Sequence, residues 1–128
     1  MTDSKLFLDS NIWLGYVLGN FPKTKEIVES KNAILFTSII CLHEVYKKMK
    51  KISSETDAKK AIQFMEDNSI IIGINKEIAI QAAENCEMHK LHTIDSLIYS
   101  SAQNLKVQFI TADIDFKNLP NTQTIQLG

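Results

Sequence analysis

The chain has 128 residues, which fits one domain with a substantial core. Hydrophobic residues make up 45% and charged residues 23%, and no apolar run approaches the roughly 20 residues needed to span a bilayer. The net charge is −1, which excludes a generally basic nucleic-acid-binding protein, so any such binding must rely on a local patch.

Strand and helix patterns alternate along the first half of the chain. Apolar runs predict strands at 5–9 and 33–38, and the second run is continuous enough for a buried parallel strand. Gly19, Asn20 and Pro22 are expected to close the first helix. The helices of this half are expected at 10–19, 24–31, 39–51 and 53–68.

The same alternation continues in the second half. Strands are expected at 69–74, at 107–112 and, at an edge of the sheet, at 124–127. Helices are expected at 75–89, capped by Asn75, and at 92–104. This alternation predicts an α/β fold, a three-layer α/β/α sandwich whose central, mostly parallel sheet has four to five strands. We expect the whole chain, residues 1–128, to form this single domain.

The helix at 92–104 carries a carboxylate beside its apolar face. Asp95 lies within that face, one turn before Ile98. The apolar positions at helical spacing are Leu91, Ile94, Leu97, Ile98 and Ala102. A buried, unpaired carboxylate is costly, and the chain contains no arginine that could pair with it. The helix therefore implies a partner of another kind.

Three other acids accompany successive apolar elements. Asp9 ends the first predicted strand and Asp113 follows the strand at 107–112. Both are therefore placed at the carboxyl edge of a parallel sheet, where ligands bind. Glu44 borders the apolar line of the helix at 39–51. The topology alone leaves the position of Asp95 relative to this edge open.

Each acid also has a structural interpretation that needs no ligand. Asp9 could be an N-cap or an Asx turn, and Asp113 could belong to a simple turn in "TADID". Glu44 could be a solvated helix residue, and Asp95 could be a first-turn acid that interacts with the helix dipole. The coincidence of four acids in successive elements favours a shared site.

Four segments, "FLDSNIWL", "SIICLHEV", "TIDSLIYSSA" and "FITADIDF", together resemble the four acidic motifs of PIN-domain ribonucleases. This family includes the toxins of VapBC-type toxin–antitoxin pairs. The resemblance implies that Asp9, Glu44, Asp95 and Asp113 converge at one end of the sheet and bind Mg²⁺ or Mn²⁺, with Asp115 as the alternative fourth acid. Such an all-oxygen set of ligands suits a hard cation.

The activity implied by this resemblance is metal-dependent hydrolysis of RNA phosphodiester bonds. The cation would reverse the local field of the acids, polarise the phosphoryl group and activate water. Asn11 and Thr111 are expected to orient the acids or the scissile phosphate. Lys47 and Lys48 are either RNA contacts or part of a solvated, dipole-matched helix end. His43 is expected on the polar face or as an RNA contact rather than as a metal ligand.

The resemblance also implies partners, namely a homodimer and, for a toxin, a small antitoxin protein that covers the acidic site. The alternatives are a PIN-family RNA-processing nuclease outside a toxin pair and a PIN-like module that binds RNA or a partner without cutting. A phosphorelay receiver domain would need an acid after the third strand, where "IIIGIN" has none. The polar residues 1–9 predict no signal peptide, and Cys41 and Cys86 fit reduced core thiols, so we expect a cytoplasmic protein.

Overall fold

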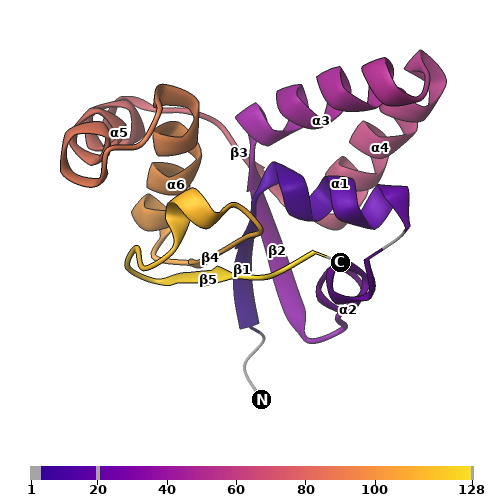
Figure 1. Ribbon diagram of the computed structural model, residues 1–128, viewed down its shortest axis with the longest axis horizontal. Coiled ribbons are helices and arrows are strands. Elements are labelled where there is room, and N and C mark those ends of the chain that lie inside the picture. The colour runs from indigo at the N-terminus through magenta and orange to yellow at the C-terminus, as the bar shows by residue number, and fades with distance from the viewer. Residues whose placement is uncertain (1–3, 20, 128) are drawn as a thin grey trace.

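The computed structural model describes residues 4–19 and 21–127 (Figure 1). Within these residues, five strands form one sheet in the order β3-β2-β1-β4-β5, and every neighbouring pair is parallel. The strands are β1 (Ser4–Leu8), β2 (Ala33–Ser38), β3 (Ile70–Ile72), β4 (Gln108–Thr111) and β5 (Thr122–Thr124). The predicted parallel sheet is confirmed. The edge strand lies at 122–124 rather than at 124–127, because its partner β4 ends at Thr111, opposite Thr124.

Helices cover both faces of this sheet, as Figure 1 shows. One face is covered by α1 (Ser10–Leu18), α2 (Pro22–Val28), α3 (Ile39–Ile52) and α4 (Glu55–Asn68). The other face is covered by α5 (Lys76–His89), α6 (Thr93–Leu105) and a 3₁₀ turn, η1 (Ile114–Phe116). The three-layer α/β/α architecture is therefore confirmed. None of the helices in the described ranges combines the length and the apolar character that crossing a bilayer requires.

Local chemistry explains most helix ends. The first helix ends at Leu18, and Gly19 takes a left-handed conformation (φ 75°) that a residue without a Cβ adopts easily. Asn20, expected to help close this helix, lies outside the described residues. The second helix begins at Pro22 rather than at residue 24, because proline suits the first helical turn. Asn75 caps α5 as predicted, since its Oδ1 accepts a hydrogen bond from Ile78 N at 2.8 Å.

The buried face of α6 differs from the prediction at one position. Ile98 and Ala102 are buried, but Ile94 is 45% exposed. Ile94 lies in the first helical turn, beside a surface hollow that Glu44 also lines, so no helix or strand covers it. Small hydroxyl residues share the buried face of α6 with these apolar side chains; they are Ser96, Ser100 and Ser101.

An aromatic cluster holds the sheet to the layer formed by α6 and η1. Phe109 on β4 contacts Phe7 on β1, Tyr99 on α6 and Phe116 on η1, with ring centroids 5.0–6.2 Å apart. Tilted and edge-on contacts of this kind stabilise a core beyond the area that they bury. The cluster therefore fixes the positions of β1, β4 and α6, the elements that lead into the site described next.

Candidate acidic site

The order of the strands creates a crevice beside the end of β1. From β1 the chain moves to β2 and β3 on one side, and it then returns to place β4 on the other side of β1. In parallel sheets, ligands bind outside the carboxyl ends of the strands at such a reversal. Asp9 directly follows β1, and Thr111 ends β4. Both residues therefore stand at this crevice.

Asp9 is held by hydrogen bonds from both sides of the crevice. It lies just beyond β1, not within it, and caps α1 by accepting from Ser10 N at 2.7 Å. Its Oδ2 accepts from Thr111 Oγ1 at 2.7 Å and from Asn11 Nδ2 at 3.3 Å. Asn11 Oδ1 in turn accepts from Ala112 N at 3.0 Å. The N-cap interpretation of Asp9 and its place at the sheet edge are thus both correct, and the side chain is fixed in one orientation.

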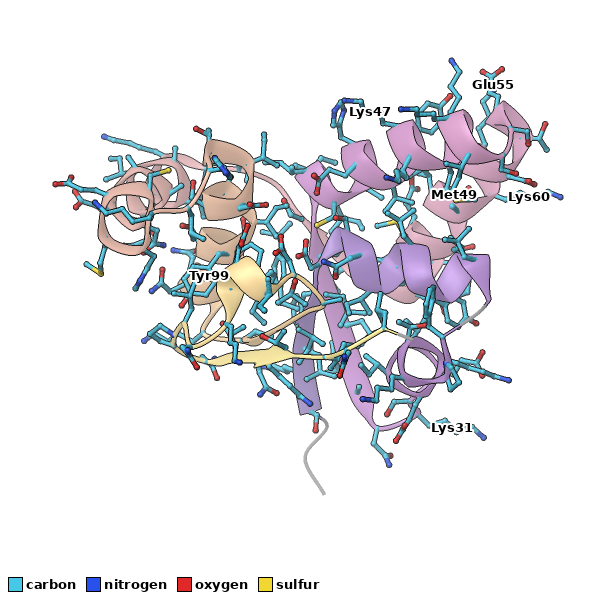
Figure 2. The ribbon with its side chains drawn as sticks, in the orientation of Figure 1. Lys31, Lys47, Met49, Glu55, Lys60 and Tyr99 are labelled. Atoms are coloured by element: carbon cyan, nitrogen blue, oxygen red, sulfur yellow. The ribbon has the colours of Figure 1, made fainter. Side chains whose placement is uncertain are left out.

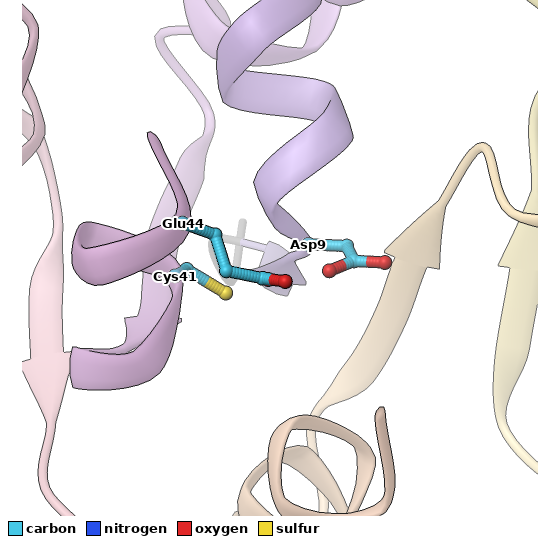
Figure 3. Close-up of side chains that lie close together, drawn as sticks. All are labelled: Asp9, Cys41 and Glu44. Carbon is cyan, nitrogen blue, oxygen red and sulfur yellow. The ribbon is translucent and has the colours of Figure 1, made fainter. Parts of the chain in front are cut away.

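Glu44 approaches Asp9 from α3. Ser38 ends β2 and caps α3 by accepting from Ile40 N at 3.0 Å, so this helix starts at the same sheet edge. In Figure 3, Glu44 and Asp9 point toward one another, and the Cys41 thiol lies beside them. One ligand atom from each of these three residues lies within 4.8 Å of the other two.

The sequence interpretation missed that Cys41 lies beside the acids of this site. The thiol is free and buried, as expected, and it donates a long hydrogen bond to Leu8 O at 3.9 Å. It also borders the acids, which we did not expect. The available signal was the spacing, because Cys41 and Glu44 are three residues apart and therefore lie on one side of α3.

Asp95 reaches the same edge from α6. This helix leads into β4 through a short connection and therefore runs antiparallel to the strand. The first turn of α6, which contains Asp95, must therefore lie at the carboxyl edge of the sheet. Topology alone is thus sufficient to place Asp95, and the contrary expectation was wrong. Asp95, Asp113 and Asp115 each offer a carboxylate oxygen within 4.8 Å of the other two.

Asp113 and Asp115 differ in how they are anchored. Asp113 is half-buried, and its backbone N–H donates to Thr111 Oγ1 at 3.0 Å. Its Oδ1 accepts from Asp115 N at 2.9 Å and so caps η1. Asp115 is exposed. One hydroxyl, that of Thr111, therefore contacts the side chain of Asp9 and the backbone of Asp113.

The electrostatics link the two groups of acids. Burial raises the pKa of Asp9 from 3.8 to about 7, with hydrogen bonds from Thr111 and Ser10 opposing the shift and the charges of Glu44 and Asp95 adding to it. Burial also raises the pKa of Asp95, and the charges of Asp113 and Glu44 raise it further.

Within residues 4–19 and 21–127, no ion pair joins a protein cation to these carboxylates, although the charge of His92 partly offsets the raised pKa of Asp95. The one ion pair in these ranges joins Lys59 to Glu55 on α4, away from the site. Carboxylate oxygens that crowd together without a basic partner are the ligand set of a hard divalent cation. The residues of the site therefore fit Mg²⁺ or Mn²⁺ by their own chemistry.

Basic residues of α3 begin directly beside Glu44. Glu44 shares a hollow of about 480 Å³ with Ser10, Leu14 and Ile94. The basic residues that line the same hollow are His43, Lys47, Lys48 and Lys51. Figure 2 shows Lys47 on the outer side of α3, away from the sheet. Positive charge therefore extends from the acidic crevice along the outer surface of this helix.

Replacing Thr111 with Val should destabilise the fold more than the same change at Thr37. Valine keeps the shape of threonine but removes the hydroxyl that contacts Asp9, Asn11 and Asp113. We expect a loss of about 1–3 kcal/mol in the free energy of unfolding, measured by urea denaturation. Thr37 is the matched control because it is equally buried and its hydroxyl, which donates to Leu8 O and interacts with the Cys41 thiol, has no hydrogen bond to the acids. Equal losses in the two variants would contradict a special role of Thr111.

Comparison with known proteins agrees with the fold described above. The PIN domain profile matches residues 6–121, which contain all four acids. A comparison with curated protein sequences gives no match. Among solved structures, a toxin–antitoxin complex from Klebsiella pneumoniae is similar at 27% identity and a TM-score of 0.80, over 97% of this chain and 100% of that chain.

Two further solved structures show the same fold at lower identity. VapBC2 from Rickettsia felis, bound to a DNA fragment from its promoter, has 20% identity and a TM-score of 0.77 over 97% of this chain and 99% of that chain. VapC20 from Mycobacterium tuberculosis, a toxin that cleaves the Sarcin-Ricin loop, has 16% identity and a TM-score of 0.72 over 88% and 91%. The resemblance inferred from the four acidic motifs is confirmed, and this chain belongs to the PIN domain family.

Proposed function

We propose that this protein is a divalent-metal-dependent ribonuclease that hydrolyses phosphodiester bonds in RNA. One observation carries the proposal: two groups of acids, Asp9 with Glu44 and Asp95 with Asp113, come to the sheet edge where the strand order reverses, and the charges of Glu44 and Asp95 both act on Asp9. Among the described residues, none of these acids forms an ion pair, and burial together with neighbouring carboxylates raises the pKa of Asp9 and of Asp95. The RNA specificity and the metal rest on the family resemblance and on this ligand chemistry.

Each group at the crevice has a proposed role. Asp9, Glu44, Asp95 and Asp113 would hold Mg²⁺ or Mn²⁺. Once bound, the cation supplies positive charge at the scissile phosphate and makes a water molecule acidic enough to act as the nucleophile. Thr111 and Asn11 fix the carboxylate of Asp9 through the hydrogen bonds described above. Lys47 and Lys48 attract the phosphates of the RNA strand beside Glu44.

Asp113 is the better fourth acid. Its backbone is tied to Thr111, which also holds Asp9, so the two carboxylates keep a defined relation. Asp115 is exposed, and although its carboxylate also lies near Asp95 and Asp113, its hydrogen bond to the site is the one that its backbone N–H donates to Asp113. We therefore assign Asp115 a smaller role than Asp113.

We further propose that the protein is the toxin of a toxin–antitoxin pair and forms a homodimer. The likeness to the toxin–antitoxin complex from Klebsiella pneumoniae, which extends over nearly the whole of both chains, supports the toxin, and the homodimer rests on the family resemblance alone. A small antitoxin-like reading frame beside the gene would strengthen the proposal. A light-scattering mass of one chain at micromolar concentrations would contradict the dimer. A PIN-family RNA-processing nuclease outside a toxin pair is the remaining alternative.

Purified protein should cleave RNA in Mg²⁺ or Mn²⁺ and stop in EDTA. The acids repel the phosphodiester unless a cation offsets their charge, so removing the cation should remove nearly all cleavage. End-labelled transcripts resolved on denaturing gels measure this directly, and adding excess Mn²⁺ after EDTA is the control for irreversible damage. Cleavage that persists unchanged in EDTA would exclude the metal mechanism. RNA binding without any cleavage would favour a non-catalytic PIN-like module.

A further inference from the structure

A second hollow lies on the outer surface of α3 and α4. It is an open groove of about 780 Å³. Its apolar part is formed by Ile39, Leu42, Tyr46 and Ile62. Its basic part is formed by His43, Lys47, Lys50 and Lys51. No acidic residue is among the described residues that line it. We call this surface the α3–α4 groove.

The α3–α4 groove is continuous with the acidic crevice. His43, Lys47 and Lys51 line both this groove and the hollow that contains Glu44. Along the axis of α3, the seven steps from Glu44 to Lys51 span only about 10 Å. A polymer with one phosphate at the crevice would therefore continue directly onto the groove.

We propose that the α3–α4 groove is a nucleobase subsite for a single-stranded stretch of RNA next to the cut. The inference rests on the ribonuclease function proposed above. Tyr46 and its apolar neighbours offer a surface on which an unstacked base can lie, because every base has an apolar face that stacks on aromatic side chains. Lys47, Lys50 and Lys51 carry the positive charge that the flanking phosphates require.

The charge of the groove decides between the possible occupants. An amphipathic protein helix would also cover the apolar residues, but a row of lysines gives a polyanion a specific advantage. A base paired in an A-form duplex keeps its faces stacked and cannot reach the apolar residues. The groove therefore selects single-stranded or looped RNA. It assigns affinity for unstacked bases, with a modest preference that follows their stacking strength, to Tyr46, and affinity for phosphates to the lysines.

This assignment can be tested with a pool of random-sequence single-stranded RNA. The pool is cleaved in Mn²⁺ and the cut ends are sequenced. The wild-type protein should prefer certain bases at one position near the cut. Tyr46→Ala should slow cleavage of the pool roughly tenfold, a typical cost of losing one base–aromatic contact, and should flatten this modest preference, whereas Tyr46→Phe should retain both. An unchanged preference at every position in a folded Tyr46→Ala protein would overturn the subsite.

The lysines provide a matched pair of variants. Lys50→Ala should slow cleavage of all sequences alike and reduce the dependence on salt, because it removes a phosphate contact. Lys76→Ala removes the same charge from the exposed start of α5, on the opposite face of the sheet, and should do neither. Equal effects of the two variants would contradict a phosphate track along α3.

Photocrosslinking separates failure of the subsite from failure of the nuclease. Single-stranded RNA containing 5-iodouridine is irradiated with the Asp95→Asn protein in Mg²⁺, and the crosslinked peptide is identified by mass spectrometry. A crosslink at Tyr46 is expected. Crosslinking there while wild-type protein cuts no RNA would uphold the subsite and overturn the nuclease. Cleavage by the wild type with no crosslink in α3 would uphold the nuclease and overturn the subsite. This measurement keeps Tyr46 intact, so it remains decisive if Tyr46→Ala does not fold.

Discussion

Replacing Asp95 with Asn is expected to lower RNA cleavage by orders of magnitude while raising the melting temperature of the metal-free protein near pH 8. The change removes one proposed metal ligand but keeps the size of the side chain. It also removes a charge that burial and the carboxylates of Asp113 and Glu44 disfavour, as the raised pKa of Asp95 indicates. The position in the first turn of α6 would by itself favour the charge by about 0.3–1 kcal/mol.

Calorimetry with and without Mn²⁺ is the measurement for Asp95→Asn. A cation that binds only the folded protein raises its melting temperature, so losing a ligand should shrink this rise. Asp67→Asn, a change of an exposed acid on α4, is the control and should alter neither the rise nor the cleavage. A rise as large as that of the wild type in Asp95→Asn would remove Asp95 from the site.

Replacing the other acids should reduce cleavage to different extents. Losses of cleavage comparable to that of Asp95→Asn are expected for Asp9→Asn, Glu44→Gln and Asp113→Asn. Asp115→Asn should cost less, because Asp115 is exposed and less firmly anchored. If Asp115→Asn proves more damaging than Asp113→Asn, the assignment of the fourth acid is wrong.

The metal-free protein is also expected to lose stability as the pH rises from about 4 to about 7. Asp9 has a pKa of 3.8 when unfolded and about 7 in the fold, so the fold favours its neutral form. Below pH 3.8 the carboxyl is protonated in both states and costs nothing. Above pH 7 it is ionised in both, and the full cost of about 4 kcal/mol applies.

Urea unfolding in EDTA at pH 5 and pH 8 measures this effect. We expect the free energy of unfolding to be lower at pH 8 by roughly 3 kcal/mol from Asp9 alone. Mn²⁺ should reduce the difference, because it binds the ionised carboxylate. Asp9→Asn cannot ionise and should show a much flatter profile, whatever its absolute stability. Equal stability of the wild type at the two pH values would contradict the raised pKa.

The sequence was sufficient for the fold and for the elements that carry the acids. Alternating apolar strands and amphipathic helices have one common solution, a parallel sheet covered on both faces, and Asp9 and Asp113 follow strands within it. The position of Asp95 could also have been predicted from the sequence. A helix that returns to a parallel strand through a short connection must begin at the carboxyl edge of the sheet. The position of Asp95 stayed open in the sequence-based prediction because the direction of this helix was not used.

Other features of the site depend on contacts between distant segments, which local patterns do not reveal. In "TADIDF" the two acids look alike, and only the turn geometry ties Asp113 to Thr111 while leaving Asp115 exposed. Ile94 fits the apolar periodicity of α6, but its side chain is partly exposed and lines the surface hollow that also contains Glu44. Burial of a residue near the end of an element depends on what lies opposite, not on its own spacing.

The hydrogen bond between Thr111 and Asp9 joins residues 102 positions apart and has a consequence for how the protein is made. A chain growing on the ribosome folds from its N-terminus, and contacts between distant segments close last. Until β4 has emerged and paired with β1, Asp9 lacks the hydroxyl that orients it, and Asp113 has not been placed. A nascent or truncated chain that lacks β4 therefore has Asp9 without its orienting hydroxyl and has no Asp113, so under the proposed ribonuclease function such a chain should not cleave RNA.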